Sequence, residues 1–191
     1  MQDDTTRANE LVLAAHGNLA AVQELVRTRP ELINQPGVGP AVGGETPLAA
    51  ASHTHNRAIA ETLLANGAEH DIYTAVFMED RPRVEAFLRA KPDLANTPGI
   101  HDIPILSFAT TPEMAELLIA SGAEVNAMSR APFQTTPLHG AARRGYVGVA
   151  DVLLQHGADA TIADYNGKTP VELVGTPEVS AVFRAHGILV E

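Results

Sequence analysis

The histidines offer the most varied chemistry in this sequence, which contains eight of them. An imidazole can bind zinc, transfer a proton near neutral pH or close a hydrogen bond in a turn. His53 and His55 form the densest local group, and His16 lies in the corresponding turn of an earlier segment. Zinc-binding histidines on one helix are typically four residues apart, whereas a spacing of two at a helix end does not place both rings on one face. A composite metal site built from several turns, with carboxylates such as Asp71 or Asp102, stays open as an alternative.

Other catalytic patterns are missing from the sequence. The absence of cysteine excludes thiol catalysis, disulfides and thiolate metal sites. No serine lies in a G-x-S-x-G turn, and residues 37–39 lack the partners that complete a phosphate-binding loop. We therefore expect no catalytic residue, no metal ligand, no cofactor and no enzymatic activity.

Composition disfavours two classes of partner. The 191 residues carry 13 Lys and Arg against 23 Asp and Glu, giving a net charge of −10, and only 4% are aromatic. Such a balance disfavours nucleic acid and anionic membranes. No apolar run reaches the roughly 18 residues needed to cross a bilayer. Because the first residues are acidic and polar, unlike a secretory signal, we expect a cytoplasmic protein.

Recurring segments define the elements that must position any site. Thr136-Pro137-Leu138-His139 opens the clearest segment, and Thr-Pro recurs at 46–47 and at 169–170. A Gly-Ala-acid segment recurs at 67–69, 122–124 and 157–159. Threonine before proline is typical of a helix start, glycine of a helix end, and apolar residues between them recur at helical spacing. Each segment is thus predicted to be a pair of short helices that cannot bury its apolar face alone.

The segments resemble the ankyrin-repeat family, whose period is about 33 residues and whose signature is T-P-L-H-x-A. Residues 136–141 match that signature. The resemblance implies an all-α solenoid, with residues 1–191 forming one domain. The six expected repeats, called repeats 1 to 6 below, span residues 8–35, 46–70, 71–96, 103–126, 136–159 and a shortened C-terminal cap at 169–187. The Pro-acid-Leu-x-Asn endings at 30–34 and 92–96 are similar to those of bacterial ankyrin proteins.

The sequence departs from the repeat pattern in three places, and each departure indicates a local difference in structure. The usual hairpin between repeats 2 and 3 is missing after Glu69. Repeat 4 has residues 103–109 in place of the Thr-Pro-Leu-His opening, which predicts a shortened first helix and a notch. The connection at 127–135 has two extra residues and brings Phe133 near a hairpin tip, where the ring either contacts a partner or folds back over its neighbours.

The resemblance implies that the protein binds another protein through hairpin tips and the ends of first helices, which line the concave side of such stacks. Carried over position by position, the candidate contact residues are His53, Thr54, Met78, Glu79, Phe133, Arg143, Arg144, Tyr165, Asn166 and Lys168, with Asp164 and Gly167 shaping the last turn. Repeats 5 and 6 are favoured, because tyrosine and arginine are frequent in binding hot spots. Residues 92–129 hold no Lys or Arg, which predicts an acidic patch on repeat 4 beside a basic one on repeat 5.

The sequence leaves alternatives open for both the oligomeric state and the function. We expect a monomer, although the last helix, near 177–185, offers apolar side chains for a weak dimer, and the apolar tail at 187–191 either covers the cap or fits a partner's groove. One alternative function is a metal-dependent enzyme or metal-binding protein that uses histidines and carboxylates on a repeat scaffold. Another is a structural or capping subunit of a larger complex.

Overall fold

The computed structural model describes residues 2–39, 42–130 and 133–189, with residues 2–8 described only as helix backbone. Over these ranges the chain forms ten α-helices, five 3-10 helices and no strand, which confirms the predicted all-α class. The chain divides into two compact units, an N-terminal unit at Met1–Met78 and a C-terminal unit at Glu79–Glu191. Because this boundary falls inside repeat 3, the single domain expected over 1–191 stays a prediction.

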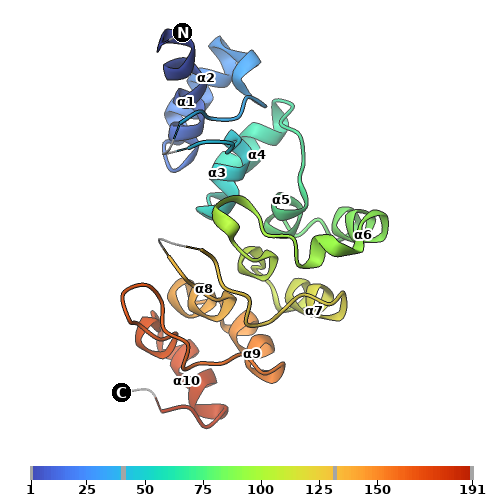
Figure 1. Ribbon diagram of the computed structural model, residues 1–191, viewed down its shortest axis with the longest axis vertical. Helices are drawn as coiled ribbons and strands as arrows, with labels where there is room; N and C mark the ends of the chain where they lie inside the picture. Colours follow the sequence, from blue (N-terminus) through green and yellow to red (C-terminus); the bar gives the residue numbers. More distant parts are fainter. Residues whose placement is uncertain (1, 40–41, 131–132, 190–191) are drawn as a thin grey trace. The chain divides into compact units, whose positions relative to one another are not determined.

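Each unit is built from short helices in the order that the repeats predict (Figure 1). The N-terminal unit holds α1 Gln2–Ala15, α2 Leu19–Thr28, α3 Pro47–His53, α4 Arg57–Ala65 and α5 Ile72–Phe77, with a 3-10 helix at Pro30–Leu32. The C-terminal unit holds α6 Arg81–Ala90, α7 Pro112–Ala120, α8 Pro137–Arg144, α9 Val147–Gln155 and α10 Pro177–Ala185, with 3-10 helices at Pro92–Ala95, Ile100–Asp102, Ile105–Phe108 and Val171–Leu173.

Helix starts follow the predicted chemistry. The Thr46 hydroxyl accepts the N–H of Ala49 at 3.1 Å at the start of α3, and the Asp71 carboxylate accepts the N–H of Thr74 at 2.6 Å at the start of α5. Such side chains satisfy backbone donors that have no partner within the helix. At the other end, Gly145 closes α8 with a φ of 75°, a left-handed conformation that glycine adopts without a steric penalty.

The core of each unit consists of apolar faces from neighbouring helix pairs. In the N-terminal unit α1 packs on α3 and α2 on α4, and in the C-terminal unit α9 packs on both α7 and α10. Leu48 and Leu138, from the two Thr-Pro-Leu openings, are each 1% exposed. Alanines such as Ala50 and Ala142, both fully buried, let the helices approach closely. Burial therefore runs from one repeat to the next within a unit.

Asparagine side chains join consecutive repeats at three corresponding places. Asn34, Asn96 and Asn126 each donate to the glycine carbonyl of the following Gly-Ala-acid segment and accept the N–H of its acidic residue. The segments are residues 67–69, 122–124 and 157–159, and the six N···O distances lie between 2.7 and 3.2 Å. We call each such arrangement an asparagine clamp. The clamps link the Asn endings to the Gly-Ala-acid segments, which the sequence shows only as separate motifs.

Repeats 4 and 6 differ from the others as predicted. Each opens with a 3-10 helix, at Ile105–Phe108 and Val171–Leu173, so the shortened first helix of repeat 4 is confirmed. In the cap, α10 buries Val179 and Phe183 completely. Residues 190 and 191 of the apolar tail lie outside the described residues. Among the helices described, none combines the length and apolar character of a membrane span.

We expect the Asn126→Ala substitution to lower the free energy of unfolding by about 1–2 kcal/mol, because it removes both hydrogen bonds of a clamp. Denaturant titration measures the change. Asn166→Ala is the matched control, since Asn166 is exposed at a hairpin tip, and its effect should stay within about 0.5 kcal/mol. Equal effects of the two substitutions would contradict a stabilising role for the clamp.

Candidate functional site

Two exposed aromatic side chains stand on adjacent loops of the C-terminal unit. Phe133 is 52% exposed and Tyr165 is 66% exposed. The Tyr165 N–H donates to the carbonyl of Phe133 at 3.2 Å, so the two loops lie side by side. Of the two alternatives for Phe133, the structure therefore shows the exposed ring. Exposed aromatic side chains on adjacent loops are a frequent feature of protein-binding surfaces.

Hydrogen bonds fix the second of these loops to α8. The Asp164 carboxylate accepts the N–H groups of Asn166 at 2.8 Å and Lys168 at 2.9 Å, which confirms its predicted place in the turn. His139 Nδ1 accepts the N–H of Thr136 at 3.1 Å, so Nε2 carries the proton that it donates to the Lys168 carbonyl, also at 3.1 Å. Burial lowers the pKa of His139, which favours this neutral, structural imidazole.

The three predicted basic contact residues lie in different surroundings. Arg143 is exposed at the end of α8. Arg144 is half-buried, and its guanidinium lies so close to Gly140 that a β-carbon there would be 2.9 Å from Nη1. Burial, and next the charge of Arg143, lowers the pKa of Arg144 to about 10, so it stays charged at neutral pH. Lys168 forms an ion pair with Glu172 at 2.9 Å, which partly neutralises its charge.

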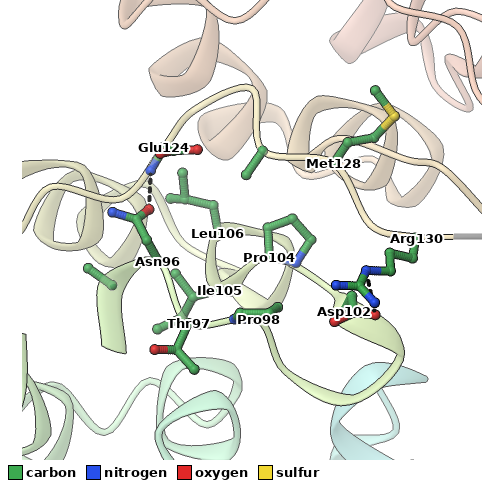
Figure 2. A pocket seen from close by; sticks show the side chains of 12 residues that line it. Asn96, Thr97, Pro98, Asp102, Pro104, Ile105, Leu106, Glu124, Met128 and Arg130 are labelled. Carbon is green, nitrogen blue, oxygen red and sulfur yellow. Dashed lines mark hydrogen bonds and ion pairs between the residues drawn. The ribbon is translucent and has the colours of Figure 1, made fainter. Parts of the chain in front are cut away.

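A hollow of about 240 Å³ lies beside the shortened first helix of repeat 4 (Figure 2). Residues 104–106 contribute its apolar wall, and Met128 lies on the neighbouring loop. The Asp102 and Arg130 side chains form an ion pair at 3.3 Å on its rim. The acidic stretch at 92–129 therefore meets the basic residues that begin at Arg130, and their opposite charges partly cancel here.

The four remaining predicted contact residues are divided between the two units. In the N-terminal unit the His53 side chain is only 13% exposed, Thr54 is exposed, and Met78, just after α5, is half-buried. Glu79 begins the C-terminal unit, where its carboxylate accepts the hydroxyl of Thr110 at 2.7 Å. These placements do not test a role in binding, which stays a prediction.

One group of metal-ligand residues lies in the described part of the chain: His16, Glu45 and His53, all in the N-terminal unit. The sequence places His16 and His53 in corresponding turns of two repeats, whereas Glu45, just before the Thr46 cap, carries no sequence signal of its own. His55 is not part of the group, since its ring instead contacts Phe77 edge-on, with the centroids 5.2 Å apart. Burial raises the pKa of the Glu45 carboxyl, and the charge of His16 opposes that shift.

Comparison with known proteins agrees with this architecture. A family model described as ankyrin repeats in three copies matches residues 84–173. The chain is 32% identical over 113 residues to cyclin-dependent kinase 4 inhibitor B of Rattus norvegicus, which covers 58% of this chain and 85% of that relative. It is 37% identical over 73 residues to the putative E3 ubiquitin-protein ligase XBAT35 of Arabidopsis thaliana, covering 38% of this chain but only 16% of the ligase.

Among solved structures, the crystal structure of the ankyrin repeat domain of Bcl-3 has the same fold. The TM-score is 0.52 at 22% identity, and the match covers 92% of this chain and 97% of that one. The chain belongs to the ankyrin-repeat family. Ankyrin repeats are protein-interaction modules, and this chain is a module of that kind.

We expect Lys168→Ala to raise the pKa of Glu172, which now stands at about 2, without restoring its ordinary value of 4.5. The N–H of Thr169, which donates to this carboxylate at 2.9 Å, is the largest cause of the shift and survives the substitution. Since the folded-state pKa is depressed, this stabilisation is present above pH 4.5 and is lost as the pH falls towards 2. An NMR titration of the carboxyl measures the change, with Lys91→Ala as control. A full return to 4.5 would assign the whole shift to Lys168.

Proposed function

We propose that the C-terminal unit binds its protein partner through the loops of Phe133 and Tyr165 together with the exposed end of α8 at Arg143. The observation that carries this proposal is the pair of exposed rings on two loops joined by a backbone hydrogen bond. Large aromatic side chains contribute much binding energy once a partner desolvates them. The asparagine clamps and the His139 hydrogen bonds hold the loops in place, which reduces the entropy lost on binding.

The chemistry of these residues specifies the kind of partner. The two rings fit an apolar side chain, and Arg143, with Arg144 beside it, fits a carboxylate. Lys168 adds less attraction, because Glu172 already pairs with it. We therefore propose that the partner is a protein whose surface presents an apolar side chain flanked by acidic residues. Asn166, exposed at the tip between them, supplies polar contacts.

In the N-terminal unit we propose Thr54 and Met78 as a second contact set, and Glu79 as a further contact residue of the C-terminal unit. His53 contributes less to such a surface than the sequence suggests, because its side chain is mostly covered. The rat relative is named as an inhibitor of cyclin-dependent kinase 4. For this chain we carry over only the general mode of action, which is binding rather than catalysis.

We further propose that the protein is cytoplasmic, binds neither nucleic acid nor membranes, and acts as a monomer. Burial of Val179 and Phe183 within the unit leaves α10 with less apolar surface for a weak dimer than the sequence suggests. The net charge of −10 supports the exclusion of anionic partners. A bacterial source is proposed from the endings at 30–34 and 92–96 alone, since the two relatives named above come from a rat and a plant.

Affinity capture from an extract of the producing cells tests the surface, read by quantitative mass spectrometry. A partner recovered by the unaltered chain should fall at least about tenfold with Phe133→Ala/Tyr165→Ala and with Arg143→Glu/Arg144→Glu, the effect of about 1.4 kcal/mol of lost binding free energy. Arg89→Glu is the matched charge control, because Arg89 is exposed on α6 outside the proposed surface.

Equal recovery by all four proteins would move the contact to another surface. Loss with Arg89→Glu as well would point to a general charge effect. Recovery of no specific protein would favour a structural subunit that is stable only inside its complex.

A further inference from the structure

Three metal-ligand side chains converge from separate parts of the N-terminal unit. His16 lies in the turn after α1, Glu45 lies just before α3, and His53 is the last residue of α3. Helix α1 packs on α3, so the end of the first helix in repeat 1 meets the residues that flank the first helix of repeat 2.

The distances between these groups suit a small cation. His53 Nε2 lies 2.9 Å from Glu45 Oε1, and His16 Nε2 lies 3.4 Å from Glu45 Oε2. The three ligand atoms all lie within 4.8 Å of one another. Ligand atoms bound to a tetrahedral zinc ion at 2.0–2.2 Å stand about 3.3–3.6 Å apart, so a cation needs only side-chain adjustments of about an ångström.

A hydrogen bond sets the orientation of the His16 ring. Its Nδ1 lies 2.9 Å from the carbonyl oxygen of Val12, which can only accept, so Nδ1 carries the proton. In the neutral ring the lone pair of Nε2 then faces Glu45. Histidines that bind metals typically donate their second nitrogen to a carbonyl or carboxylate in this way.

The charge of the group also calls for a cation. Glu45 is fully buried, and a buried carboxylate is costly unless a positive charge lies next to it. Two imidazoles provide that charge only by taking up a proton, whereas a divalent ion provides it while both rings stay neutral. Two imidazole nitrogens and one carboxylate oxygen favour zinc over calcium or magnesium, which prefer oxygen ligands.

The three ligand residues are not a structural feature that every repeat shares. In repeat 5 the positions of Glu45 and His53 are occupied by Thr135 and Arg143, and there His139 fixes the opening of the helix instead. Three ligands leave a fourth coordination position, which water can reach because the His16 side chain is 33% exposed.

We propose that His16, Glu45 and His53 form a zinc-binding site that ties repeat 1 to repeat 2. All three ligands lie in the N-terminal unit, and none belongs to the binding surface proposed for the C-terminal unit. Bound zinc adds stability in proportion to the logarithm of its concentration above the dissociation constant. Affinity should fall as the pH is lowered, because protons compete with the metal for its ligand atoms.

Calorimetric titration of the untagged, metal-stripped full chain with zinc chloride tests the site. We expect one zinc ion per chain, and an affinity at least about 100-fold lower in each of His16→Ala, Glu45→Gln and His53→Ala. His55→Ala is the matched control, two residues from a ligand, and should bind zinc as the unaltered chain does. Zinc should raise the melting temperature of the control but not that of the three ligand variants.

A second measurement needs no variant and so does not depend on how well a variant folds. In ¹⁵N NMR spectra of the unaltered chain, zinc should shift the Nε2 resonances of His16 and His53 while Nδ1 of His16 keeps its proton. An unaltered chain that takes up no zinc at micromolar concentration would overturn the proposal, as would zinc uptake that the His16→Ala/His53→Ala double variant retains.

Discussion

The asparagine clamp is the interaction on which each unit of this structure depends. A pair of short helices buries too little apolar surface to be stable alone, so each pair must be held against the next in one register. The clamp does this with one amide that donates to a glycine carbonyl and accepts an N–H two residues further on. Because both bonds go to the backbone, the side chains of the joined repeats can vary without disturbing the joint.

Asp71 shows what happens where the clamp residue changes. It follows the Gly-Ala-acid segment of repeat 2 at the position that Asn126 occupies in repeat 4. Its carboxylate caps α5 through the N–H of Thr74, and a short connection replaces the usual hairpin. Aspartate accepts hydrogen bonds but has no amide to donate, so it can begin a helix but cannot make both bonds of a clamp. The division of the chain into two units falls in the repeat that Asp71 begins.

The sequence predicts the architecture well because the motifs that begin and end each helix pair recur along the chain. The Thr-Pro openings, the helical spacing and the shortened helix of repeat 4 all depend on local rules. Local rules do not predict the clamps or the His16–Glu45–His53 group, because their residues are distant in sequence and come together only when the repeats pack. Glu45 is the clearest case, since in the sequence it is an ordinary acidic residue before a cap. The sequence also leaves the exposure of Phe133 open, because that exposure depends on the neighbouring loop whose Tyr165 N–H donates to the Phe133 carbonyl.

The close approach of Arg144 to Gly140 bears on how fast a complex would dissociate. A glycine inside a helix costs about 1 kcal/mol relative to alanine, yet here it leaves the space that the guanidinium occupies. An arginine held in one rotamer before binding loses less side-chain entropy than a mobile one when it meets a carboxylate. That saving lengthens the lifetime of a complex more than it speeds its formation, since most affinity differences arise in dissociation. In the proposed complex, the space that Gly140 leaves for the Arg144 guanidinium would therefore favour slow dissociation.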